Sequence, residues 1–272
     1  MVTDRVSTEA QGPRDDVVLW EVADGVATVT LNRPGSRNAI NGAMGRRLPE
    51  VLAEMDARDD VGAMVLTGAD PAFCAGVDLK EWGGGEDLGE PDDARGPYRG
   101  PFPPRTTLLI GAVNGPAVTG GLELALGCDL LVASERARFA DTHARVGVIP
   151  GWGLTVMLCQ SVGVRRAREM SATGNYVSAE VALAWGLVNH VVPHEELLPF
   201  ARTLALGAVH NDRAAVSEML RIYDAVADTT VAEAWEIEAA ASRAWEGDGF
   251  DLAEIEHRRT GIVERGRDQL RT

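Results

Sequence analysis

Hydrophobic positions in the first half of the chain alternate between short apolar runs and a spaced, helix-like pattern. Residues 17–22 and 26–31 are rich in β-branched side chains, and Asp24-Gly25 between them is typical of a hairpin turn. Apolar side chains at helical spacing predict an amphipathic helix carrying Met44, Leu48, Val51, Leu52 and Met55. Short apolar runs predict further strands at residues 63–68, 107–113 and 129–134, and residues 138–140 begin the segment that contains His143.

The second half of the chain is mostly helical in pattern. We expect helices at residues 154–160, 165–171 and 178–185, the last with Ser178 as its N-cap, and one more strand at residues 188–193. This order predicts a layered α/β core followed by a helical appendage. The expected divisions are a flexible tail at residues 1–16, a core at 17–195 and a C-terminal helical region at 196–272.

One long segment lacks a regular pattern. Residues 81–105 are rich in glycine, proline and aspartate, which predicts a surface loop.

Composition narrows the class of protein. The formal net charge of −15 argues against nucleic acid and against anionic membrane surfaces as partners. No run reaches the roughly 18 apolar residues that a membrane span needs. The polar N-terminus lacks a signal-like apolar stretch, and the three cysteines have no paired spacing. We therefore expect a cytoplasmic protein.

Two glycine-bearing segments carry the candidate chemistry. Residues 72–80 read Ala-Phe-Cys-Ala-Gly-Val-Asp-Leu-Lys, and residues 114–123 read Asn-Gly-Pro-Ala-Val-Thr-Gly-Gly-Leu-Glu. Each ends an apolar run in a turn and restarts as a helix with charge in its first turns. Two such turns facing one another would offer two free backbone N–H groups beside a carboxylate. That arrangement suits stabilisation of an oxyanion and transfer of a proton.

These segments resemble the enoyl-CoA hydratase/isomerase (crotonase) family. The remaining markers occur in family-like order: residues 31–34 (Leu-Asn-Arg-Pro), 38–39 (Asn-Ala), 128–129 (Cys-Asp), 147–151 (Gly-Val-Ile-Pro-Gly) and 182–188 (Ala-Leu-Ala-Trp-Gly-Leu-Val). The resemblance implies a crotonase-like spiral core of repeated β-β-α units with a C-terminal helical trimerisation region. It also implies an acyl-CoA thioester as substrate, no cofactor besides the coenzyme A of that substrate, and a homotrimer or dimer of trimers.

The resemblance assigns roles to three residues. The backbone N–H groups of Val77 and Gly120 would form the oxyanion hole for the thioester carbonyl, and Glu123 matches the first of the two hydratase glutamates. Gly76 and Gly120 would allow unusual dihedrals and a close approach of the ligand. Apolar neighbours should raise the pKa of Glu123. Two simpler readings remain: glycines that only make tight turns, and a glutamate that only complements its helix dipole.

His143 stands where hydratases usually carry a second glutamate. Histidine can hold water and relay protons, so hydration stays possible. Isomerases of the family manage with one carboxylate. A β-diketone hydrolase branch carries histidine here, together with an aspartate where this chain has Trp152. A purely structural histidine is a further alternative.

Other residues are weaker candidates. Trp152 either narrows the acyl pocket or only packs, and Lys80 and Arg37 could meet the phosphates of coenzyme A. The family positions further suggest substrate contacts at Ala75, Gly76, Asp78 and Gly121. No metal-ligand spacing and no Ser–His–Asp arrangement stands out, and His190, His194, His210 and His257 are interpreted as structural or solvated.

The leading hypothesis is a hydro-lyase that adds water to a 2-enoyl-CoA through an oxyanion-stabilised enolate, as in fatty acid metabolism. The alternatives are enoyl-CoA isomerisation, hydrolytic cleavage of a β-diketone, and a non-catalytic acyl-CoA-binding protein. Acyl chain length and pathway do not follow from the sequence.

Overall fold

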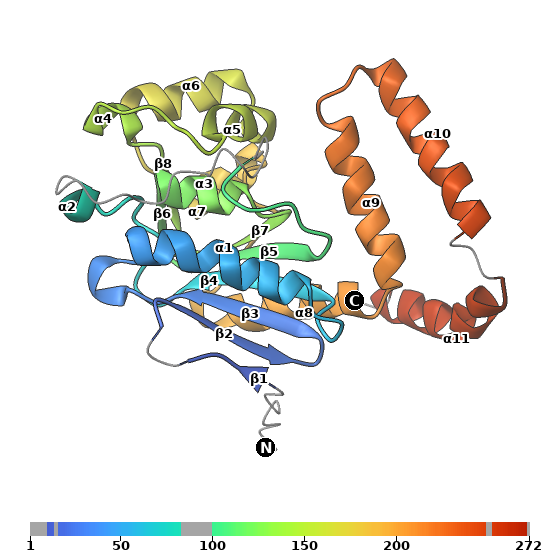
Figure 1. Ribbon diagram of the computed structural model, residues 1–272. Coiled ribbons are helices and arrows are strands. Elements are labelled where there is room, and N and C mark those ends of the chain that lie inside the picture. Colours follow the sequence, from blue (N-terminus) through green and yellow to red (C-terminus); the bar gives the residue numbers. More distant parts are fainter. Residues whose placement is uncertain (1–9, 14–15, 83–99, 249–251, 271–272) are drawn as a thin grey trace. The chain divides into compact units, whose positions relative to one another are not determined.

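The computed structural model describes residues 10–13, 16–82, 100–248 and 252–270, so most of the predicted loop at 81–105 lies outside the described residues. The chain divides into two compact units between Ser217 and Glu218. Figure 1 labels the elements, and each unit is described by itself. Among the described residues, no helix is both long and apolar enough to span a membrane.

The first unit is built on a seven-stranded sheet in the order β1-β2-β3-β4-β5-β7-β10. Figure 1 labels β1 to β5 and β7 of this sheet. β2 and β3 pair antiparallel, and their turn places Asp24 and Gly25 at φ 51° and 75°, which confirms the predicted hairpin. From β3 to β10 every pairing is parallel. The strands are β1 (Ala10–Gln11), β2 (Val18–Ala23), β3 (Val26–Leu31), β4 (Ala63–Gly68), β5 (Leu108–Val113), β7 (Leu130–Ser134) and β10 (His190–Val192).

A second, three-stranded sheet has the order β6-β8-β9. β6 (Pro116–Val118) pairs parallel with β8 (Arg138–Ala140), which pairs antiparallel with β9 (Val177–Ser178). The sequence pattern predicts none of these strands, because two or three residues are too few to show a period of two.

Helices of the first unit connect and cover these strands. The predicted N-cap Ser178 accepts a hydrogen bond from the Val181 N–H at the start of α7. The elements are η1 (Pro34–Ser36), α1 (Gly42–Asp56), α2 (Leu79–Trp82), α3 (Gly120–Leu126), α4 (His143–Val146), α5 (Leu154–Val162), α6 (Val164–Thr173), α7 (Ala179–Trp185), η3 (His194–Glu196) and α8 (Leu197–Val209).

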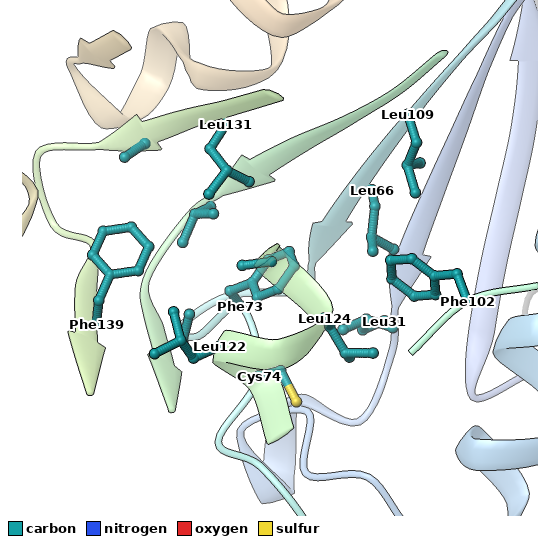
Figure 2. Packing of buried hydrophobic residues seen from close by; sticks show 14 of the residues in the cluster. Leu31, Leu66, Phe73, Cys74, Phe102, Leu109, Leu122, Leu124, Leu131 and Phe139 are labelled. Atoms are coloured by element: carbon teal, nitrogen blue, oxygen red, sulfur yellow. The ribbon is translucent and has the colours of Figure 1, made fainter. Parts of the chain in front are cut away.

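The large sheet is covered on both faces. β4 is buried along its whole length, and its side chains alternate between two apolar clusters, Met64 and Leu66 in one, Ala63 and Val65 in the other. The first cluster also contains the predicted apolar face of α1, all of it buried. Figure 2 shows its centre, where side chains from β3, β4, β5, β7, β8 and α3 converge around Phe73.

Two boundaries differ from the predicted ones. α8 packs on the sheet through Leu197, Ala201 and Ala205, so the first unit continues past the expected end of the core at residue 195. At the other end, β1 lies within the expected flexible tail and pairs with β2. An amphipathic helix pattern does not reveal which surface the helix covers, and two residues are too few to predict a strand.

The second unit contains most of α9 (Arg213–Val226) and the helices α10 (Val231–Asp248) and α11 (Leu252–Gln269). Before α10, the Thr230 hydroxyl accepts from the Glu233 N–H, and the Glu233 carboxylate accepts from the Thr230 N–H. This reciprocal pair is a capping box, which fixes where α10 begins.

Close packing of α3 on the residue 72–80 segment leads to a first prediction. A Cβ on Gly121 would lie 2.1 Å from the Cys74 carbonyl oxygen, a backbone atom that cannot step aside. Gly121→Ala should therefore lower the free energy of unfolding by about 3 kcal/mol in urea titrations. Gly35→Ala, where a Cβ meets no atom within 4 Å, is the matched control and should stay within about 0.5 kcal/mol of the parent. Equal midpoints for the two variants would contradict this packing.

Candidate functional site

The segment following β4 passes between two other parts of the chain. Cys74 forms a bridge with Ala117 of β6, and Val77 forms a bridge with Ile40. In the second bridge the Ile40 N–H donates to the Gly76 carbonyl, and the Asp78 N–H donates to the Ile40 carbonyl, both at 2.8 Å. Since the residues on either side of Val77 make these bonds, the N–H of Val77 itself points away from Ile40.

The two glycine-bearing turns are in direct contact, as the sequence predicts. Gly76 has φ +90°, and a Cβ there would lie 2.8 Å from the Val118 carbonyl oxygen and 3.5 Å from the Gly120 nitrogen. Gly120 is the first residue of α3, so its N–H has no acceptor within the helix. Within the described part of the chain, neither this N–H nor that of Val77 has a recorded acceptor.

The sequence allows for unusual dihedrals at Gly120. The positive φ of this turn is found one residue earlier, at Thr119, which has φ 55° and ψ −114°. A Cβ on Gly120 would make only ordinary contacts, 3.5 Å from the Ile40 and Trp152 side chains.

Glu123 lies one helical turn after Gly120 and is 3% exposed. Its Oε1 accepts hydrogen bonds from the N–H groups of Trp152 (2.8 Å) and Leu154 (3.4 Å). Its Oε2 lies 3.6 Å from Nε2 of His143. Burial raises the pKa of Glu123 above its ordinary value of 4.5, although the Trp152 N–H and the nearby His143 act in the opposite direction.

His143 is oriented by a residue that sequence reasoning missed. Its Nδ1 lies 2.7 Å from Oδ1 of Asp141, which also accepts the His143 backbone N–H at 3.1 Å. Burial acts to raise the pKa of Asp141, but hydrogen bonds from His143 and Ser171 outweigh it and lower that pKa. An ionised Asp141 makes Nδ1 the donor and leaves Nε2 facing Glu123. The available signal was an aspartate two residues before the histidine, directly after β8.

Glu123 and His143 open into a pocket of about 170 Å³. Four of its lining residues have polar side chains, and the others are apolar or glycine. The lining residues are Thr119, Glu123, Thr142 and His143, together with Ala75, Val77, Leu79, Val146, Val148, Ile149, Gly151 and Trp152. The pocket therefore combines a carboxyl and an imidazole 3.6 Å apart with an apolar lining.

Five of the predicted site residues line this pocket, namely Ala75, Val77, Glu123, His143 and Trp152. Gly76 and Gly120 form the contact between the two turns beside it. Trp152 does both things that the sequence left open, because it lines the pocket and also packs against the main core cluster.

Four predicted residues lie away from the pocket lining. Gly121 packs on Cys74, and Asp78 pairs with Arg33 at 3.0 Å. Lys80 and Arg37 are exposed, and the Arg37 carbonyl accepts the Ala75 N–H.

A serine, a histidine and an aspartate also meet elsewhere, which the sequence did not indicate. Ser134 Oγ lies 3.0 Å from Nδ1 of His194, whose Nε2 lies 3.1 Å from Asp70. Ser134 is fully buried and already accepts the Arg136 N–H, so no substrate can reach it. These contacts among Ser134, His194 and Asp70 connect η3 to the ends of β4 and β7, so their role is structural.

Comparisons with known proteins identify sequences and structures that are similar to this chain. The family model described as "Enoyl-CoA hydratase/isomerase" matches residues 21–248. The "Probable enoyl-CoA hydratase 1, peroxisomal" of Arabidopsis thaliana is 41% identical over 207 residues, 75% of this chain and 76% of that protein. The 1,2-epoxyphenylacetyl-CoA isomerase of Escherichia coli K12 is 37% identical over 199 residues, 70% of this chain and 75% of its own.

Solved structures show the same fold. The crystal structure of an enoyl-CoA hydratase from Mycobacterium tuberculosis H37Rv superposes with a TM-score of 0.72 at 49% identity, covering 84% of this chain and 98% of that one. The chain therefore belongs to the enoyl-CoA hydratase/isomerase family, and the predicted crotonase-like α/β fold is confirmed. It is an enoyl-CoA hydratase-like enzyme, which removes the non-catalytic binding protein from the alternatives.

The buried Glu123 generates a prediction on stability. Its pKa is raised on folding, so the carboxyl is neutral in both states below about pH 4.5, and the cost of burying its charge grows as the pH rises through the folded-state pKa. Glu123→Gln should therefore raise the free energy of unfolding at pH 8, and this gain should shrink towards pH 4.5. Glu236→Gln, at an exposed position on α10, is the control. A gain that grew on acidification would have the wrong sign.

Proposed function

We propose that this enzyme hydrates a 2-enoyl-CoA thioester to the 3-hydroxyacyl-CoA. The observation that carries the proposal is the buried series Asp141–His143–Glu123, which opens into the pocket beside the N–H groups of Val77 and Gly120. A thioester carbonyl needs donors where its negative charge develops, and water needs a base at the β-carbon.

In the proposed reaction, the carbonyl oxygen of the substrate accepts hydrogen bonds from the N–H groups of Val77 and Gly120. Water held between Glu123 and His143 adds its oxygen to Cβ and gives up a proton to the pair. The electron pair of the Cα–Cβ double bond moves towards the carbonyl, and the enolate then takes a proton from the pair at Cα. Asp141 stabilises the positive charge that His143 acquires if it carries the proton.

Isomerisation is the second candidate, and one observation favours it. Glu123 is the single carboxylate among the described residues that line the pocket. One carboxylate can carry a proton between two carbons of an enoyl chain without activating water. The relative from Escherichia coli is named as an isomerase of another CoA thioester, 1,2-epoxyphenylacetyl-CoA.

Turnover of crotonyl-CoA, with the product identified by mass spectrometry, separates the two candidates. Under the hydratase proposal, Glu123→Gln and His143→Ala should each lower kcat about 10²-fold or more, because each removes a positioned acid–base group. Asp141→Asn should lower kcat as well, since an amide no longer fixes the tautomer of His143. His143→Glu should recover part of the activity lost in His143→Ala.

The matched control is His210→Ala, an exposed histidine at the end of α8, which should keep the parent kcat. If His143→Ala leaves hydration intact while Glu123→Gln abolishes it, the chemistry runs on one carboxylate. Isomerisation would then replace hydration as the proposed reaction.

Coenzyme A binding is proposed at the exposed end of the pocket. Leu79 lines the pocket, and the next residue, Lys80, is exposed, so a ligand leaving past Leu79 would bring its phosphates towards a cation. Arg37 is the second candidate for contact with these phosphates.

A cytoplasmic location also remains a proposal, supported by the unpaired spacing of the cysteines.

A homotrimer or dimer of trimers is the proposed assembly. Large apolar side chains are exposed on α9 and on α10, among them Tyr223 (71%) and Trp235 (68%), and such surfaces usually mark an interface. Light scattering at micromolar concentration should give three or six times the 29.0 kDa chain mass. Replacing both Tyr223 and Trp235 by glutamate should lower that mass, whereas Glu236→Gln should not. A monodisperse monomer of the parent protein would refute the assembly.

A further inference from the structure

Thr119 has a backbone conformation that its side chain disfavours. It connects β6 to α3 with φ 55° and ψ −114°, a region that glycine enters freely and a β-branched residue does not. Among the described residues, the other non-glycine residues with positive φ are an aspartate, an arginine and an asparagine. Glycine would serve this turn better, so the threonine side chain must contribute something else.

That contribution is not helix capping. Thr119 is the N-cap residue of α3, and Thr142 is the N-cap residue of α4, positions where a threonine hydroxyl normally accepts an N–H of its own helix. Neither side chain does so. Instead, the two hydroxyl oxygens lie 2.5 Å apart, and Oγ1 of Thr119 also accepts the backbone N–H of Thr142 at 3.3 Å.

This contact joins the two halves of the site. The residue after Thr119 is Gly120, whose N–H belongs to the proposed oxyanion hole, and Thr142 lies between Asp141 and His143. The N–H of Thr119 donates to the Ala140 carbonyl at 2.9 Å, so the same two segments are also held by their backbones. Both threonines are among the residues that line the pocket.

We infer that Thr119 and Thr142 are a positioning pair that holds the Gly120 N–H in register with His143. The inference rests on the proposed function, in which Gly120 and His143 act on one substrate. The carbonyl carbon and the β-carbon of that substrate are two bonds apart, so the donor and the water-holding side chain must keep a fixed separation. A glycine at position 119 would relax the backbone but could not reach Thr142.

The first test separates stability from rate. Thr119→Gly removes both the strain and the hydroxyl, so its thermal midpoint should equal or exceed that of the parent. Its kcat for crotonyl-CoA should nevertheless fall about 10-fold or more, with KM changed by less than about 3-fold, because alignment is lost rather than binding. Thr119→Ser keeps the hydroxyl and should recover most of the lost kcat. Thr203→Val, at an exposed position on α8, is the control and should behave as the parent.

A double-mutant cycle tests the pairing itself. Thr142→Val should lower kcat as far as Thr119→Gly does, and the combined variant should lose little more, since both changes break one contact. Multiplicative losses in the combined variant would overturn the pairing. A Thr119→Ser enzyme as slow as Thr119→Gly would overturn the role of the hydroxyl.

A measurement without substrate keeps this inference apart from the proposed function. The Cε1–H resonance of His143, assigned with His143→Gln, should move in Thr119→Gly and stay close to its parent position in Thr119→Ser. If the parent enzyme does not hydrate crotonyl-CoA but the resonance moves as expected, the reaction is refuted and the link between the two segments stands. If Thr119→Gly keeps both the parent kcat and the parent resonance, the inference is wrong and the reaction stands.

Discussion

The close approach of two backbone turns governs this molecule. The bridge between Cys74 and Ala117 brings the segment after β4 against the start of α3, and the absence of a Cβ at Gly76 and Gly121 makes the distance possible. The arrangement of the site depends on this contact. The contact sets the segment that carries Val77 against the start of α3, and one turn further along α3 the buried Glu123 accepts the N–H of Trp152.

Burial of the acid–base group is the energetic counterpart of that geometry. A carboxyl at 3% exposure costs free energy whenever it is ionised, and two backbone N–H groups offset only part of the cost. The same burial raises its pKa towards the range in which it can both give and take a proton. Asp141 shows the opposite balance, because its hydrogen bonds outweigh burial and favour the ionised form. The imidazole of His143 therefore lies between two carboxyls whose pKa values are shifted in opposite directions, raised at Glu123 and lowered at Asp141.

The sequence predicts most of the strands and helices because their patterns are local. The hairpin at Asp24-Gly25, the apolar face of α1 and the two glycine-bearing turns are all found as predicted. The short strands β6, β8 and β9 are recognised by their pairing with one another, and α8 is recognisable as a helix but not as a cover of the sheet. In the site, His143 was singled out from the sequence, whereas its partner Asp141 was missed although it lies only two residues earlier. The positive φ of Thr119 depends on backbone dihedrals that no local pattern encodes.

The two hydrogen bonds that Oε1 of Glu123 accepts also determine which oxygen of the carboxyl can carry the proton. With that oxygen occupied by Trp152 and Leu154, the free lone pairs that remain are mainly on Oε2, on the side of His143. A flat enoyl group anchored through its carbonyl would therefore present a single face to this oxygen and to the imidazole. Oxygen and hydrogen would add from that same face, and the new hydroxyl-bearing carbon would be formed in one hand only.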